Sequence, residues 1–223
     1  MKISELLKQD KVTLSFEVFP PKTSSSYESV ARATQEIAAL RPDFMSVTYG
    51  AGGGTSEHTV NIAADLRKKY DVTVLTHLTC VSSTREHVAK MVQKYKENGI
   101  ENILALPGDI PEGGAPHSDY HYAAELVRDI KSQGDFCIGG ACYPEGHVEA
   151  ANKTEDILHL KEKVEAGCEF LTTQMFFDNN IMYNFLYRIR EKGITVPVVA
   201  GIMPVTNVKQ IKRITSMSGT YLP

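Results

Sequence analysis

The segment Thr73–Pro107 reads TVLTHLTCVSSTREHVAKMVQKYKENGIENILALP, and it decides the fold class. It begins with a β-rich run, Thr73–Cys80, and ends with a second one, Glu101–Pro107. Between them, Ser83 and Glu86 have the spacing of a capping box, which is typical of the first turn of a helix. Strand, helix and strand in this order predict a βαβ unit with two parallel strands.

The same alternation runs along all 223 residues, so we expect seven strands, each followed by a helix. Seven units fit a (βα)8 TIM-type barrel of typically ~250 residues better than an open doubly wound sheet. The sequence predicts one barrel domain over residues 1–223, C-terminally incomplete because the last βα unit is missing. The predicted strands are Thr13–Phe19, Phe44–Gly50, Thr73–Cys80, Glu101–Pro107, Cys137–Pro144, Phe170–Phe176 and Val196–Ile202.

The composition narrows the partners to small molecules or another subunit. Lys and Arg number 24 against 27 Asp and Glu, and a net charge of -3 disfavours nucleic acids and anionic membranes. No run approaches the ~20 apolar residues of a membrane span, and no apolar export signal follows Met1. The four cysteines form no CxxC pair, so we expect reduced thiols, no metal and a cytoplasmic protein.

Polar residues recur where the predicted strands end, which is where barrel enzymes place their sites. Within a strand, polar and apolar residues alternate, so the polar ones share the face toward the barrel axis. Glu17 is the strongest functional candidate, because glutamate is rarely buried without a partner. The residues at or just past the strand ends are Glu17, Thr48, His77, Asp109, Tyr143 and Gln174.

Each candidate also has a structural explanation. Asp109 lies in a stretch rich in turn formers, and a lone His77 is more often a core histidine than a functional one. Gln210 is explained by capping-box spacing with Asn207. The glycine-rich residues 50–55 match neither the P-loop nor GxGxxG and are a weak anion-binding signal.

The order and spacing of these motifs along nearly the whole chain resemble the methylenetetrahydrofolate reductase family. The resemblance implies an FAD-dependent barrel that reduces 5,10-methylenetetrahydrofolate to 5-methyltetrahydrofolate with electrons from NADH or NADPH. It also implies a homo-oligomer. The motifs are Ser15–Pro21, Ser46–Gly50, Thr76–Cys80, Gly108-Asp109, Tyr143–Glu145 with His147, Lys161–Gly167, Thr173–Asp178 and Gly201–Val205.

The resemblance gives each strand end a role. Glu17 would be the general acid that protonates N10 of the folate, with burial raising its pKa. Asp109 would lie near both flavin and folate and favour a cationic intermediate. Gln174 and Gln210 would join them in binding folate. The implied FAD-binding residues are Thr48, His77, Leu106, Gly108, Asp109, Tyr122, Ala123, Ala141, Tyr143, His147, Asp156 and Lys163.

Three positions depart from the family pattern. Pro107 and Glu162 stand where the family carries arginine, and His159 stands where it carries asparagine. These changes remove two cations near the cofactor and leave Lys163 as the main one.

Two other functions remain open. An aldolase or phosphate-binding isomerase would be another barrel enzyme, but an aldolase would carry a Schiff-base lysine at a strand end, and no predicted strand has one. A flavin- or folate-binding subunit without its own catalysis would tolerate loss of the Glu17 carboxyl. A zinc methyltransferase fits worst, because paired cysteine ligands are lacking.

Overall fold

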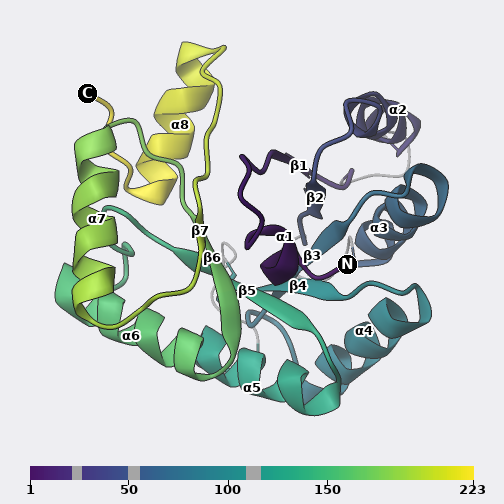
Figure 1. Cartoon of the computed structure of the whole chain (residues 1–223), viewed down its shortest axis with the longest axis horizontal. Coiled ribbons are helices and arrows are strands. Elements are labelled where there is room, and N and C mark those ends of the chain that lie inside the picture. Colours follow the sequence, from purple (N-terminus) through teal and green to yellow (C-terminus); the bar gives the residue numbers. More distant parts are fainter. Residues whose placement is uncertain (22–26, 50–55, 109–116) are drawn as a thin grey trace. The chain divides into compact units, whose positions relative to one another are not determined.

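A computed structural model describes residues 1–21, 27–49, 56–108 and 117–223. Its seven strands follow one another in the sheet in chain order, β1 to β7 (Figure 1). Pairing is parallel between β1 and β2, β2 and β3, β3 and β4, and β6 and β7. This is the predicted succession of seven βα units of a TIM-type barrel.

The chain divides into two compact units, Met1–Ile138 and Gly139–Pro223, and each is described by itself. Whether they form one barrel domain over residues 1–223 stays a prediction. The first unit contains α1 (Ile3–Leu6), β1 (Ser15–Val18), α2 (Tyr27–Ala38), β2 (Phe44–Val47), α3 (Ser56–Tyr70), β3 (Val74–Thr79), α4 (Arg85–Glu97), β4 (Asn102–Leu106), α5 (Ala123–Gln133) and the start of β5 (Cys137–Cys142).

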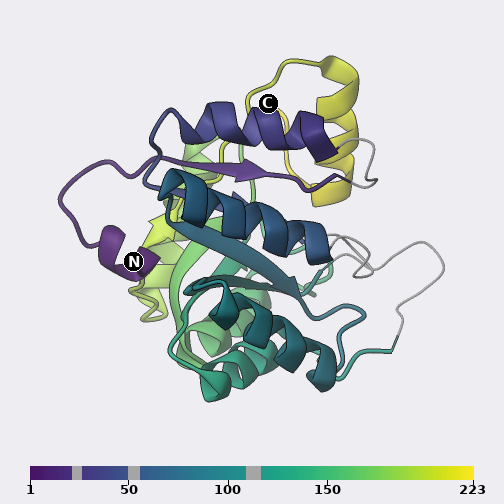
Figure 2. The same ribbon diagram turned by 90° about the vertical axis from the view of Figure 1, so that its right-hand side faces the viewer.

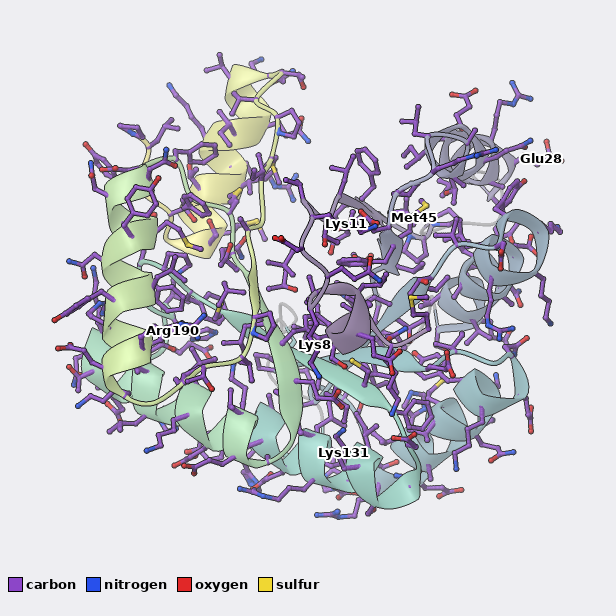
Figure 3. The ribbon with its side chains drawn as sticks, viewed as in Figure 1. Lys8, Lys11, Glu28, Met45, Lys131 and Arg190 are labelled. Atoms are coloured by element: carbon purple, nitrogen blue, oxygen red, sulfur yellow. The ribbon has the colours of Figure 1, made fainter. Side chains whose placement is uncertain are left out.

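The core of the first unit lies between its strands and its helices. Met45 and Val47 on β2 are fully buried, as the alternation along this strand predicts. Figure 3 labels Met45 between β2 and the helices of this unit, and Figure 2 shows α2 and α3 side by side. The apolar stripe of α5, Leu126, Val127 and Ile130, is fully buried as well, which confirms its amphipathic pattern.

A buried asparagine at the start of β4 ties α1 to the strands. The Asn102 side chain accepts a hydrogen bond from the Ile3 N–H at 2.8 Å. Its Nδ2 donates to the Val74 and Met1 carbonyls, each at 3.1 Å. All its polar atoms are therefore satisfied although it is buried, as a buried amide requires.

The second unit contains the rest of β5, α6 (Lys153–Glu165), β6 (Cys168–Thr173), α7 (Asn179–Glu191), β7 (Val198–Val199) and α8 (Val208–Ser218). Leu160, Leu171, Phe185 and Ile189 form its core. Arg190, labelled on α7 in Figure 3, donates to the Ile194 and Val196 carbonyls at 2.5 and 3.0 Å. These bonds hold the turn that leads into β7.

All seven strands occur near their predicted positions, with differences at the edges. β6 begins at Cys168, two residues before the prediction, and β7 has only two residues. Pro197, which lacks an N–H donor, precedes β7, and Gly201 then leaves the ladder by donating to Thr173 Oγ1 at 2.8 Å. A Cβ at Gly201 would lie 2.3 Å from the Thr173 carbonyl oxygen, so this approach requires glycine.

The N-caps of α4 and α8 and the burial of the cysteines also bear on the predictions. The cap of α4 is Thr84, which accepts from the His87 N–H at 3.1 Å, so the prediction of Ser83 as the cap is wrong by one residue. Asn207 caps α8 as predicted. All four cysteines are buried and lie outside any disulfide of the described residues. In the same ranges no helix is long and apolar enough to cross a membrane.

Candidate functional site

Three polar side chains from three adjacent strands meet in the first unit. Glu17 and Ser46 are direct cross-strand partners of β1 and β2. Ser46 pairs with Leu75 of β3, and His77, two residues further along, shares the face of Leu75. Ser46 Oγ donates to Glu17 Oε2 at 2.8 Å and lies 3.3 Å from His77 Nε2, which is itself 3.3 Å from Glu17 Oε2. We call Glu17, Ser46 and His77 the carboxylate cluster.

The carboxylate cluster favours the ionised form of Glu17. Burial alone raises the pKa of Glu17, but the hydrogen bond and charge of His77 and the hydrogen bond of Ser46 together lower it below its ordinary value. The Glu17 side chain is 44% exposed, whereas the side chain of His77 is only 8% exposed. The prediction that burial raises the pKa of Glu17 is therefore wrong, because its two polar neighbours outweigh desolvation.

Tyr95 of α4 fixes the backbone of the strand that carries His77. Its hydroxyl donates to the His77 carbonyl at 3.2 Å, and its side chain is fully buried. Burial raises the pKa of Tyr95 well above its ordinary value, so the hydroxyl keeps its proton as a donor. The hydrogen bond from Tyr95 thus holds in place the part of β3 that carries the His77 imidazole.

The other predicted residues of the first unit lie at the ends of its strands or at the start of α5. Thr48 follows β2 and donates its N–H to the Val18 carbonyl at 3.1 Å, and Leu106 ends β4. Gly108 has a φ of +83°, a value that favours glycine. Asp109 and the glycine-rich residues 50–55 lie outside the described residues.

Tyr122 and Ala123 lie at the start of α5. The Tyr122 side chain is exposed, whereas Ala123 is buried. Glu125 Oε2 accepts from the His121 and Tyr122 N–H groups at 2.7 and 3.4 Å, which satisfies donors at this helix start. The aromatic ring of Tyr122 is therefore presented to solvent by a fixed backbone.

In the second unit, a cation lies at the end of β5. Lys163 of α6 donates from Nζ to the Ala141 carbonyl at 2.6 Å. Burial raises the pKa of the nearby Asp156, although the charge of Lys163 and the His147 backbone N–H oppose this. Tyr143 and His147 pack edge to face with ring centroids 4.5 Å apart. The structure thus brings together five of the predicted cofactor-binding residues.

The two predicted folate-binding glutamines lie on different elements of the second unit and have different hydrogen-bond partners. Gln174 follows β6 and accepts on Oε1 from its neighbour Met175 N–H at 2.9 Å. Gln210 is exposed on the first turn of α8, where its N–H donates to Asn207 at 3.1 Å. On β6, the buried Thr172 hydroxyl lies on the face of Gln174 and has no hydrogen-bond partner among the described protein atoms.

The departures on α6 form an acidic surface. His159 lies 3.9 Å from Glu155 and 3.7 Å from Glu162, one turn away on either side. Glu162, which stands where the family carries arginine, supplies no cation in its place. The Cys142 thiol, in contrast, has its pKa raised to about 12 by burial, so it stays protonated and serves packing.

Sequence reasoning left Ser46 out of the predicted site. The sequence pattern does indicate Ser46, because this polar residue alternates with the buried Met45 and Val47 and therefore faces the same side of the sheet as Glu17. What the sequence lacked was the β1 to β2 register, which makes Ser46 the direct neighbour of Glu17.

Comparison with known proteins identifies the family. The model of the family described as "Methylenetetrahydrofolate reductase" matches residues 2–223. A 5,10-methylenetetrahydrofolate reductase of Pectobacterium carotovorum is 40% identical over 216 residues, which cover 96% of this chain and 72% of that protein. Its counterpart in Escherichia coli is 38% identical with the same coverage. A probable methylenetetrahydrofolate reductase (NADH) of Oryza sativa is 36% identical, and the match covers 40% of its length.

Solved structures with low sequence identity share the fold alone. A protein from Clostridium thermocellum, described as binding two copies of 5-methyl-5,6,7,8-tetrahydrofolic acid, matches with a TM-score of 0.72 at 13% identity and covers the whole chain. An oxaloacetate acetylhydrolase matches with a TM-score of 0.64, also at 13% identity. The identification rests on the family model and on the sequence relatives. The chain belongs to the methylenetetrahydrofolate reductase family.

Proposed function

We propose that this chain reduces 5,10-methylenetetrahydrofolate to 5-methyltetrahydrofolate, with FAD as cofactor and NADH or NADPH as electron donor. One observation carries the proposal. In a chain that matches this family over residues 2–223, an acidic residue lies at the end of β1 and is bonded by side chains of the next two strands. A partly exposed carboxyl that is hydrogen-bonded by neighbouring side chains is typical of a site that transfers protons.

The residues present fit an anionic flavin nucleotide. Lys163 supplies a cation at the end of β5, and its ammonium group could also donate to a diphosphate. Within the same unit, Tyr143 and His147 offer aromatic and polar edges, and the unsatisfied Thr172 hydroxyl can bond to a bound polar group. When bound, the flavin would supply hydride transfer between the nicotinamide and the folate.

Glu17 would hold and move the proton of the folate reaction. Protonation of N10 weakens its bond to the bridging carbon, and the five-membered ring opens to a cation at N5 that is ready to accept hydride. A neighbouring negative charge stabilises this cation, and Asp109 is proposed for that role from the family resemblance. Gln174 and Gln210 are proposed to orient the folate through hydrogen bonds.

The proposal is tested with a Glu17→Gln variant, which keeps the size of the side chain and removes its acid. We expect bleaching of bound flavin by NADH to persist and reoxidation by methylenetetrahydrofolate to slow by about 10²- to 10⁴-fold. Glu36→Gln, at an exposed position of α2, is the matched control and should behave like the wild type.

A binding subunit without catalysis would respond differently. It would bind flavin or folate equally well in the wild type and in Glu17→Gln, and neither would reoxidise the reduced flavin with folate. An aldolase would need a lysine at a strand end, and the seven described strands contain none.

We also propose that the protein is a cytoplasmic homo-oligomer. Apolar side chains of the second unit, among them Ile202, Val208 and Met217, are more than 60% exposed, which is a common feature of surfaces between subunits. Sedimentation of the purified chain at several concentrations tests this assembly, and a monomer at every concentration would contradict it.

A further inference from the structure

The hydrogen bonds of the carboxylate cluster determine where its protons lie. A serine hydroxyl has one hydrogen to donate, and Ser46 donates it to Glu17. Toward His77, Ser46 Oγ can then only accept, and the ionised Glu17 can only accept as well. His77 Nε2, within 3.3 Å of both oxygens, is therefore the atom that carries the proton in this arrangement.

A second arrangement of the same protons is possible. If Glu17 is neutral, its O–H donates to Ser46 Oγ, and the Ser46 hydroxyl turns to donate to His77 Nε2. The two arrangements interconvert when protons move along the chain of three groups, so Ser46 is the connecting member. Ser46 is buried, which limits the access of water to its hydroxyl.

We infer that the carboxylate cluster is a proton relay, in which His77 supplies, through Ser46, the proton that Glu17 gives to the folate. This inference rests on the proposed function, because folate would cover the exposed side of Glu17 and separate it from bulk water. His77 lies behind the carboxyl and would then be the remaining proton source.

The relay balances in atoms and charge. The relay requires a proton on both ring nitrogens of His77. The proton on Nε2 passes to Ser46 Oγ, while the hydroxyl proton of Ser46 passes to Glu17 Oε2. One N–H and one O–H bond break, and two O–H bonds form. His77 is left neutral with its proton on Nδ1, Ser46 is regenerated, and neutral Glu17 donates to N10. Solvent returns one proton per turnover after the product leaves, and no electron moves.

Few other groups can perturb the cluster among the described residues. On the neighbouring strand β4, the residue paired with His77 is the apolar Leu104. From α4, Tyr95 bonds to the His77 carbonyl and not to its ring. The pKa of Glu17 is accordingly governed by burial and by its two partners, so removing one partner has a readable effect.

The test is a titration of the Glu17 carboxyl by ¹³C NMR in the full chain without ligands, with the signal assigned by its loss in Glu17→Gln. In Ser46→Ala we expect the pKa of Glu17 to rise, because a donor to the carboxylate is removed. Ser46→Thr keeps the hydroxyl and should restore the wild-type value. Thr34→Val removes a buried hydroxyl of α2 that bonds to the Val30 carbonyl of the same helix, and it controls for changes in packing.

Kinetics of the loaded enzyme complete the test. Reoxidation of reduced flavin by folate should slow at least about tenfold in Ser46→Ala and recover in Ser46→Thr, with a changed pH profile. An unchanged Glu17 titration, or equal losses in Ser46→Ala and Ser46→Thr, would overturn the relay. If the wild type fails to reduce folate while the titration behaves as expected, the proposed function fails and the proton linkage stands.

Discussion

Replacing Asn102 with alanine should detach α1 from the strands of the first unit. The wild-type side chain makes three hydrogen bonds of 2.8 to 3.1 Å, to Ile3, Met1 and Val74. Each such bond contributes about 0.5 to 1.5 kcal/mol net, so the three bonds together contribute about 1.5 to 4.5 kcal/mol. The buried Ile3 N–H and Val74 carbonyl are left without this partner, which places the cost in the upper half of that total, at about 3 kcal/mol or more.

The assay is urea unfolding followed by far-UV circular dichroism, with thermal unfolding as a second measurement. A loss of about 3 kcal/mol corresponds to a fall in Tm of about 6 to 12 °C for a chain of this size. Gln93→Ala removes a surface hydrogen bond to Glu97 and should stay within about 0.5 kcal/mol of the wild type. A loss below about 1 kcal/mol in Asn102→Ala would refute the reasoning that these bonds hold α1.

Three further predictions concern backbone strain, cofactor binding and acid stability. Gly108→Ala should cost about 1 to 3 kcal/mol in urea unfolding, and more than Gly193→Ala, which has a similar positive φ but open space around its Cβ. Lys163→Met should weaken FAD binding, measured by quenching of flavin fluorescence, by about 10- to 100-fold, whereas Lys161→Met on the exposed side of α6 should leave it unchanged. Folding lowers the pKa of Glu17, so the ionised carboxyl contributes to stability above its ordinary pKa of 4.5, and this contribution is lost as the pH falls through the folded value. In urea unfolding, the stability advantage of the wild type over Glu17→Gln should therefore shrink as the pH falls below 4.5. A constant difference would contradict this.

The order of strands and helices could be predicted from the sequence because hydrophobic periodicity reports burial. The stripe of α5 and the buried run of β3 both follow the predicted patterns. Element ends were less predictable, since they depend on tertiary contacts. Thr84 and not Ser83 caps α4, because the Ser83 hydroxyl is committed to the Thr79 carbonyl at 2.7 Å.

The candidate site could be predicted in position but not in electrostatics. Glu17 and His77 were identified from their places at strand ends, and the family pattern gave them roles. The protonation state of Glu17 depends on Ser46, whose contact with it requires the register of two strands. A sequence supplies the alternation within each strand, whereas register and hydrogen-bond direction arise only when the strands pair.

The central claim is most directly tested by the visible spectrum of the purified, FAD-loaded chain without oxygen, recorded after NADH or NADPH and then after methylenetetrahydrofolate. The account predicts that the yellow colour bleaches with the nicotinamide and returns with the folate, with one 5-methyltetrahydrofolate formed per flavin reoxidised. A chain that binds FAD and bleaches but never recovers its colour with the folate would contradict it.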